Sequence, residues 1–427
     1  MILRGILVGE FNEDIENSGN SRACAQIDAN ARDLPLRLCA LLRLATNSLL
    51  FALALLGLTT SRCAAQSAIV KSYADRGSAF YERGDLDAAI TDFDAVISFE
   101  PSLPAAHYNR GNALFRKGEY ADAIRDYDQA ISVDSKFARA YRNRATAYYI
   151  LDRLDLAKAD SQKAIGLNPK LATAYLILGA VEEQQGRLDQ AIAAFDKCLR
   201  LQPGLAEGYN FRGSALRKRG DLRTAISDYN RAMELNPGLV SALNNRALTF
   251  MAMGDARAAA SDMDKAISLA PASSALYFNR GAMRLERGDF NGAIADMNEA
   301  ISRDPKLVNA YVDRGRARAE LNDIDGAVSD YNQALEVNPR SFLAYNNRAV
   351  IEQQQGDLER AIKDFSKAIE IDPESALAWG NRGLTYMIEG KDNEGRRDLE
   401  RAYKLDPRSK DVFERRSKAI VAKRAIA

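Results

Sequence analysis

Small and aromatic residues recur along this chain at fixed intervals of 34 residues, beginning at Val70. With each copy numbered from 1 to 34, position 4 is aromatic in eight copies and position 8 is always glycine or alanine. Position 20 is alanine in nine copies, and position 24 is mostly a large apolar residue. Positions 4 and 8 share one helical face, as do positions 20, 24 and 27. The pattern therefore predicts two amphipathic helices in each copy, with small residues where their backbones approach.

Turn-forming residues separate these two helices in each copy. Glycine at position 15 suits the left-handed conformation that ends a helix, and aspartate at position 16 suits the cap of the next helix. Proline at position 32 ends the second helix, and Ser135 replaces it in the second copy. Each helix then has about 13 residues and a length of roughly 20 Å. The glycines are Gly84, Gly118, Gly186, Gly220, Gly254, Gly288, Gly356 and Gly390, and the aspartates are Asp85, Asp221, Asp255, Asp289, Asp323 and Asp357.

A period of 34 residues built from helical hairpins indicates a stacked array. The aromatic residue at position 4, glycine at 8, alanine at 20 and proline at 32 resemble the tetratricopeptide repeat (TPR) family, over ten copies in residues 70–409. The resemblance implies an all-α fold, an α-solenoid in which antiparallel helix pairs form a right-handed superhelix. The first helix of each pair is then expected to line the concave face. Residues 410–427 are amphipathic and basic, and they predict a C-terminal capping helix.

Asparagine occupies position 6 in six of the ten copies. Helix packing does not require it there, and its amide offers both a donor and an acceptor to a peptide backbone. The row is similar to the asparagine ladder in the TPR superhelix of O-linked N-acetylglucosamine transferases, which implies that it binds extended peptides. The alternative is that these asparagines bond to local groups. The six residues are Asn109, Asn143, Asn245, Asn279, Asn347 and Asn381.

Other residues of the first helices are also expected to face the groove, by the same resemblance. In the first copies these positions are aromatic or polar, and we predict that Tyr108, Asn112 and Phe115 contribute to peptide binding. Ile177 and Phe211 interrupt the asparagine row, which favours two shorter binding segments over one continuous track.

Arginine at position 7 and aspartate at position 23 each occur in nine copies. Both exceptions, Leu178 and Ala194, fall in the fourth copy. This shared exception leads to the hypothesis that the two residues form an ion pair between the helices of one hairpin.

The charge and motif content indicate no catalytic chemistry. The chain has 59 basic and 58 acidic residues, so no basic footprint suggests nucleic acid as a partner. His107, the only histidine, and Cys198 occupy repeat positions 4 and 27 and are predicted to be packing residues. Metal-ligand spacing, phosphate-binding loops and nucleophile motifs are all missing from the sequence. We therefore predict a protein that is not an enzyme, with no catalytic residue, metal or cofactor.

The N-terminal region differs from the repeats. Residues 44–61 are uncharged, Arg37 and Arg43 precede them, and Ala64 and Ala65 are small residues of the kind that signal peptidase requires. This pattern predicts a signal peptide at residues 34–65 and an exported, periplasmic protein. The alternative is a membrane anchor at residues 44–61, whose length is close to the minimum for a span. Residues 1–33 are predicted to be disordered or to belong to an over-long gene model.

These observations predict a non-enzymatic TPR scaffold or adaptor that binds extended peptides or protein partners on its concave face. One alternative is a structural array that associates with itself. The other is an assembly scaffold that is cytoplasmic or anchored to a membrane. The pattern leaves the oligomeric state and the identity of the partner open.

Overall fold

The computed structural model describes residues 66–426, and every regular element in this part of the chain is a helix. The helices follow one another in pairs, as the repeat pattern predicted. The predicted segments 1–33 and 34–65 lie outside the described residues. Within the described residues, no helix combines the length and hydrophobicity that crossing a membrane would need.

Ten helix pairs match the ten copies of the repeat in the described residues. In the first helix of each pair the helical segment ends near position 14, and the second helix runs from position 17 to 30. The pairs are residues 66–83 with α4 (Leu86–Phe99), α5 (Pro104–Lys117) with α6 (Tyr120–Val133), α7 (Ala138–Ile150) with α8 (Leu154–Leu167), α9 (Ala172–Gln184) with α10 (Leu188–Leu201), α11 (Ala206–Arg219) with α12 (Leu222–Leu235), α13 (Val240–Ala252) with α14 (Ala256–Leu269), α15 (Ser274–Glu286) with α16 (Phe290–Arg303), α17 (Val308–Glu320) with α18 (Ile324–Val337), α19 (Phe342–Gln355) with α20 (Leu358–Ile371), and α21 (Ala376–Glu389) with α22 (Asp392–Leu405).

The turn inside each hairpin is made by a residue with positive φ. Gly118 has φ 97°, and its N–H donates to the carbonyl oxygens of Leu114 and Phe115 at the end of α5. Two copies have no glycine at this position. Asp152 and Asn322 replace it there and adopt the same left-handed conformation, with φ 57° and 61°. Aspartate and asparagine tolerate this region better than other non-glycine residues, so the turn is kept.

The aspartates that follow these turns cap the second helices in five of the six predicted cases. Asp289, for example, accepts a hydrogen bond from the N–H of Gly292 at the start of α16. The prediction is wrong for Asp221, whose side chain makes no capping bond. Its carboxylate instead accepts a hydrogen bond from Arg219, at 2.5 Å. The caps are Asp85, Asp255, Asp289, Asp323 and Asp357.

Small residues allow the two helices of a hairpin to pack closely. A Cβ atom added to Gly213 would lie 2.7 Å from the ring of Tyr229, and one added to Gly315 would lie 2.7 Å from the ring of Tyr331. The two tyrosines are on the second helices and are buried. The predicted packing residues His107 and Cys198 are also buried, with exposed fractions of 7% and 0%.

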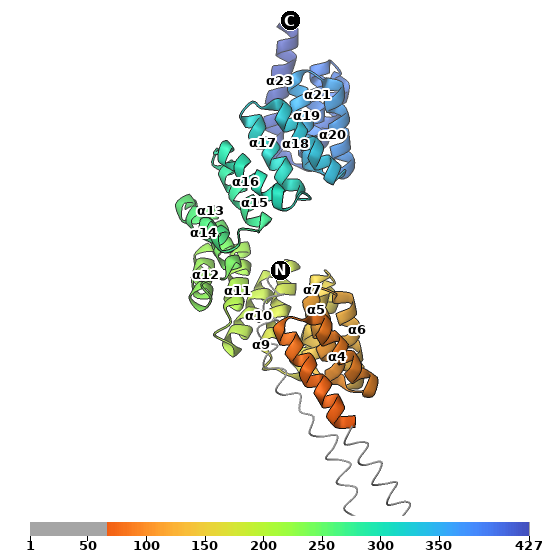
Figure 1. Cartoon of the computed structure of the whole chain (residues 1–427). Helices are drawn as coiled ribbons and strands as arrows, with labels where there is room; N and C mark the ends of the chain where they lie inside the picture. Colours follow the sequence, from red (N-terminus) through yellow and green to blue (C-terminus); the bar gives the residue numbers. More distant parts are fainter. Residues whose placement is uncertain (1–65, 427) are drawn as a thin grey trace, which may run out of the picture. The chain divides into compact units, whose positions relative to one another are not determined.

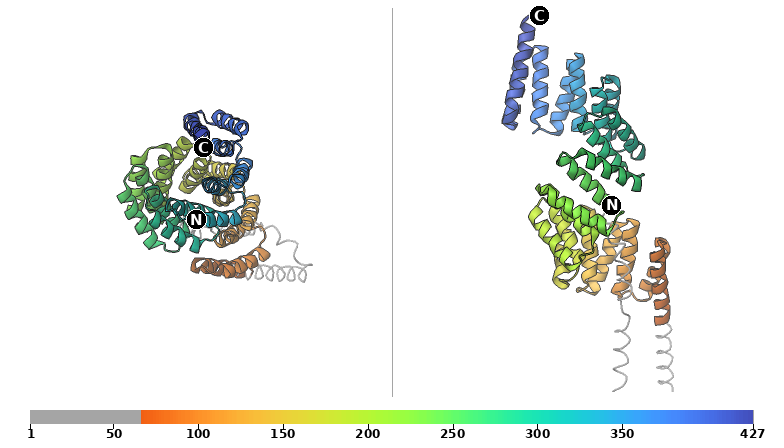
Figure 2. Two further views of the ribbon diagram at one scale, coloured as in Figure 1. Left: turned by 90° about the horizontal axis from the view of Figure 1, so that it is seen from above. Right: turned by 90° about the vertical axis from the view of Figure 1, so that its left-hand side faces the viewer.

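The described residues divide into two compact units, and the boundary between them along the chain falls after Asn245, in α13. Figures 1 and 2 show the helices of each unit stacked in chain order. From α4 to α12 and from α14 to α23 each helix packs against the next along the chain, and first helices of neighbouring pairs also touch. Such contacts join α5 to α7 and α9 to α11 in the first unit, and α15 to α17 and α17 to α19 in the second. First helices of neighbouring pairs are therefore closer together than second helices, so they line the inner face of each unit.

A final helix, α23 (Lys410–Ile426), follows the short 3-10 turn Pro407–Ser409. It packs against α21 and α22, and its Phe413 joins Leu384, Met387 and Leu399 in a buried cluster. The ring of Phe413 occupies the space that a Cβ atom on Gly380 would need. The helix thus covers the apolar end of the tenth hairpin, which is the role expected of a capping helix.

We expect Phe413→Ala to loosen the C-terminal end of the array. Replacing a buried phenylalanine by alanine typically costs about 3–5 kcal/mol of packing free energy. Amide hydrogen exchange in α21 and α23 should therefore become faster, while exchange in α5 and α6 stays unchanged. The control is Val412→Ala, because Val412 is 48% exposed. Equal exchange rates in the two variants would show that Phe413 does not hold the helix in place.

Candidate peptide-binding surface

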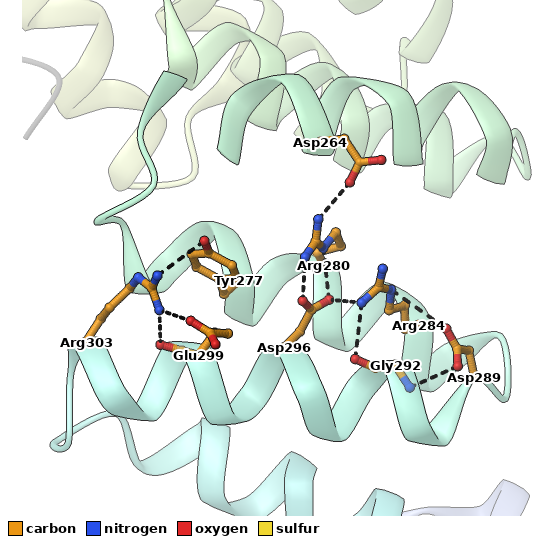
Figure 3. A network of polar contacts seen from close by, with 9 residues as sticks. All are labelled: Asp264, Tyr277, Arg280, Arg284, Asp289, Gly292, Asp296, Glu299 and Arg303. Atoms are coloured by element: carbon orange, nitrogen blue, oxygen red, sulfur yellow. Dashed lines mark hydrogen bonds and ion pairs between the residues drawn. The ribbon is translucent and has the colours of Figure 1, made fainter. Parts of the chain in front are cut away.

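Charged side chains connect the helices on one side of every hairpin except the fourth. Arg280 on α15 donates two hydrogen bonds to Asp296 on α16, at 3.0 and 2.7 Å, and a third to Asp264 on the preceding helix α14, at 2.7 Å. Figure 3 shows this arginine between the two carboxylates. The side chain of Asp296 is 3% exposed, whereas that of Asp264 is 63% exposed. The arginine therefore ties its own hairpin together and also links it to the preceding hairpin.

This arrangement confirms the hypothesis of an Arg–Asp pair within each hairpin. All nine position-7 arginines donate to the position-23 aspartate of the same copy, at distances of 2.5–3.1 Å. The bond to the preceding hairpin was not predicted, because its acceptor at position 25 varies in type. These acceptors are Asp94, Asp128, Asp196, Asp264, Asn298, Asn332 and Ser366.

The arginines also lie against the position-4 aromatic rings. In seven copies the guanidinium carbon lies 4.8–5.7 Å from the centroid of that ring. Hydrogen bonding to Asp228, together with Asp196, raises the pKa of Arg212 above its ordinary value even though partial burial opposes the shift. The rings and carboxylates that contact these arginines fix the orientation of the first helix relative to the second. This orientation decides which side chains of the first helix face inward.

Removing one arginine from this set should destabilise its hairpin. Arg212→Ala leaves the carboxylate of Asp228, which is 6% exposed, without its cation, at an expected cost of about 2 kcal/mol. Arg231→Ala is the matched control, because Arg231 and Glu234 form an exposed pair in the same hairpin that is worth under about 1 kcal/mol. Urea denaturation followed by circular dichroism measures both variants. Equal losses of stability would contradict a special role for the buried pair.

The ninth copy has a carboxylate at position 11, where the seventh and eighth copies have an arginine. Arg284 and Arg318 add a hydrogen bond to Asp296 and Asp330, at 2.7 and 2.9 Å. The corresponding residue of the ninth copy is Glu352. Burial raises its pKa to about 7, the negative charge of Asp364 adds to the shift, and Arg348 opposes it. One carboxylate oxygen of Glu352 is buried and has no hydrogen-bond partner among the described residues.

The raised pKa of Glu352 predicts a pH dependence of stability. The folded state binds this proton more tightly than the unfolded chain, whose carboxyl has the ordinary value of 4.5. The stabilisation is therefore fully present below pH 4.5 and is lost as the pH rises through about 7. Melting temperatures of the native protein and of Glu352→Gln, measured between pH 5 and pH 8, test this. The difference should favour the variant increasingly as the pH rises, and a constant difference would contradict the expectation.

Several predicted binding residues lie inside the first unit instead of on its surface. The amide nitrogen of Asn143 donates to the hydroxyl of Tyr108 at 3.1 Å and to Oδ1 of Asn112 at 2.8 Å. The hydroxyl of Tyr127 donates to the same oxygen of Asn112, at 3.0 Å. Tyr108, Asn112, Phe115 and Asn143 are at most 5% exposed. As placed, they connect the second and third hairpins and leave little surface for a peptide.

Two more asparagines of the row make the same kind of bond to the preceding repeat. Asn245 donates to Oδ1 of Asn210 at 3.0 Å, and Asn381 donates to Oδ1 of Asn346 at 3.4 Å. The alternative of local bonding therefore describes Asn143, Asn245 and Asn381, because each of them donates to a side chain of the preceding repeat. The remaining members of the row, Asn109, Asn279 and Asn347, are half-buried.

A groove on the inner face of the second unit contains one of these remaining asparagines. It has a volume of about 750 Å³ and is lined by residues of α15, α17 and α19, the first helices of copies seven to nine, and by Tyr331 of α18. Leu285, Tyr331 and Ile351 are its buried apolar residues. The polar residues around them are Glu286, Arg316, Glu320, Asn322, Asn347 and Gln354.

Most of these groove residues were not singled out from the sequence. Glu286, Glu320 and Gln354 all occupy position 13 of their copies. A comparison of that position between neighbouring copies is the signal that could have found them. It does not stand out, because position 13 also holds Ile150 and Ala252 in other copies.

Profiles of the tetratricopeptide repeat match most of the chain. The profile described as TPR repeat matches residues 77–118 and 111–152. Profiles described as Tetratricopeptide repeat match residues 138–171, 170–238, 244–307, 312–376 and 353–411. These matches cover well over half of the sequence, so the chain belongs to the tetratricopeptide repeat family. Arrays of this family are protein-interaction scaffolds and are generally not enzymes.

Solved structures share the same helical-repeat fold. The APC/C hetero-tetramer Cut9–Hcn1 aligns with a TM-score of 0.51 at 16% identity, over 70% of this chain and 59% of that one. A tetratricopeptide repeat protein from Parabacteroides merdae aligns with a TM-score of 0.50 at 22% identity, over 58% of this chain and 99% of that one. This chain thus spans less than two thirds of the first of these relatives. No curated protein sequence matches it significantly.

Proposed function

We propose that this protein is a non-enzymatic scaffold that binds an extended peptide segment of a partner protein on the inner face of its repeats. The groove lined by α15, α17 and α19 is the observation that carries the proposal. Its volume of about 750 Å³ falls within the range of about 300–1,000 Å³ that is usual for binding sites. The polar residues at its edge and the apolar residues within it suit a ligand that has both kinds of group.

The amides of Asn347 and Gln354 supply the chemistry for binding a peptide backbone. Each side-chain amide has two donor hydrogens and an acceptor oxygen, and the backbone of an extended peptide has unpaired donors and acceptors to match. Asn347 accepts a hydrogen bond from Asn346 at 3.2 Å and forms a further side-chain hydrogen bond with Tyr331. These bonds orient its amide, and the exposed amide of Gln354 lies further along the same helix. The apolar residues Leu285 and Ile351 can then contact side chains of the peptide.

The expected affinity follows from these few interactions. Each hydrogen bond contributes a net free energy of only about 0.5–1.5 kcal/mol, while association costs several kcal/mol in lost motion, on the order of 4 or more. Binding in the micromolar range is therefore expected unless side-chain contacts in the groove add to it.

The cellular location of the protein is proposed from the N-terminal sequence alone. Residues 34–65 carry the features of a signal peptide, and this supports an exported, periplasmic protein. N-terminal sequencing of the protein from the envelope fraction of its host tests this proposal. A mature chain beginning at Gln66 supports export, and a chain that retains residues 44–61 in the membrane fraction supports the anchor.

Binding of the full chain to an array of synthetic extended peptides tests the scaffold proposal. Asn347→Ala combined with Gln354→Ala should weaken binding about tenfold, which corresponds to about 1.4 kcal/mol. The control is Gln333→Ala, because Gln333 is exposed, as Gln354 is, but lies on α18 and outside the groove. Unchanged binding by the double variant would refute the groove as the site. Light scattering that shows concentration-dependent oligomers, together with no peptide binding, would favour the self-associating array instead.

A further inference from the structure

Two carboxylates in the groove have no cation to balance them. Glu286 and Glu320 occupy the same repeat position in the seventh and eighth copies, and both are exposed at the edge of the groove. Among the described residues, no side chain forms an ion pair or hydrogen bond with either carboxylate. Their negative charges therefore indicate which kind of ligand the groove would bind.

Two inner-face carboxylates of the fourth copy are compensated within the chain. Glu182 pairs with Lys158 at 2.9 Å and also with Arg187, and Glu183 pairs with Lys218 at 3.0 Å. Glu82 is a third exposed glutamate at this repeat position, in the first copy, so what distinguishes Glu286 and Glu320 is that they stand in two consecutive copies and line one groove.

The arginine of the groove does not balance these charges. Arg316 donates to Oδ1 of Asp313 at 3.0 Å, and Asp313 occupies the position where six other copies have asparagine. Burial raises the pKa of Asp313, Arg316 opposes this shift, and the negative charge of Glu286 adds to it. The groove lining thus contains two carboxylates and one guanidinium, and the guanidinium is already paired with Asp313 outside the lining.

The repeat geometry sets the distance between the two carboxylates. Because Glu286 and Glu320 share a repeat position on touching helices α15 and α17, their backbones lie about as far apart as packed helices, roughly 8–10 Å. Their flexible side chains can hold the carboxylates at a similar spacing. A peptide in the polyproline II conformation advances about 3.1 Å per residue with three residues per turn. Side chains at positions i and i+3 of such a peptide then point in the same direction, about 9 Å apart.

We propose that this groove selects an extended segment of a partner protein in which two Lys or Arg side chains are three residues apart. The two cations bind Glu286 and Glu320, and the residues between them contact the apolar part of the groove at Leu285 and Ile351. This specificity rests on the proposed function, because it names the class of peptide that the scaffold binds.

Fluorescence anisotropy with the full chain and labelled nonapeptides tests the specificity. The probes are a peptide with lysines at i and i+3, a peptide with the same lysines at i and i+1, and versions with alanine or glutamate in their place. We expect the first peptide to bind at least tenfold more tightly than the others, with the preference shrinking as salt screens the charges. Glu286→Gln with Glu320→Gln should abolish the preference, and circular dichroism checks that this variant is folded.

Glu336→Gln is the matched control, because Glu336 is exposed on α18 and lies outside the groove. It should keep the preference of the native chain. If neutral or acidic peptides bind the native chain as tightly as the first peptide, the specificity is overturned while the scaffold function stands. If the double glutamine variant keeps the preference, the two carboxylates are not its source. If no peptide of any charge binds, the proposed function fails together with the specificity.

Discussion

Close contact between a small residue on one helix and a large apolar side chain, most often a ring, on the next holds most of the hairpins together. Gly213 lies so near Tyr229 that a Cβ atom would overlap the ring, and the same is true of Gly315 and Tyr331. Because repeats contact only their neighbours, the array has no central core to compensate for a poor contact. Every other feature, including the direction in which the first helices present their side chains, depends on repeating this contact with little change.

The arginines at position 7 add a polar connection to this apolar contact. Each one bonds to a nearly buried aspartate of its own hairpin and, in seven copies, to an acceptor of the preceding one. A buried ion pair contributes little net free energy, but the geometry of a guanidinium with two partners permits few arrangements. The arginines therefore act chiefly on the register between hairpins. Leu178 and Ala194 remove this connection from the fourth copy. There Glu182 and Glu183 instead pair with a lysine of the preceding copy and a lysine of the following one.

Binding and stability compete for the same polar side chains on the inner face. Tyr108, Asn112 and Asn143 are bonded to one another across two hairpins, so they stabilise the stack. In copies seven to nine the inner helices instead leave a groove edged by the carboxylates of Glu286 and Glu320 and by the exposed amide of Gln354. A single array can thus combine segments in which polar groups are satisfied internally with segments in which they await a ligand.

The 34-residue spacing by itself determined the helix pairs, the packing positions and the Arg–Asp pairs, because each of these depends on residues at a constant separation along the chain. The spacing also identified the family, and the caps failed only at Asp221, where Arg219 competes for the carboxylate. Only the tertiary structure decided which asparagines form hydrogen bonds to a neighbouring repeat. The bond from Asn245 to Asn210 and the bond from Asn143 to Tyr108 join neighbouring repeats at positions that are not constant in residue type. Burial depends on the side chains that surround a residue in space, and these differ from one copy to the next even where the residue itself is the same.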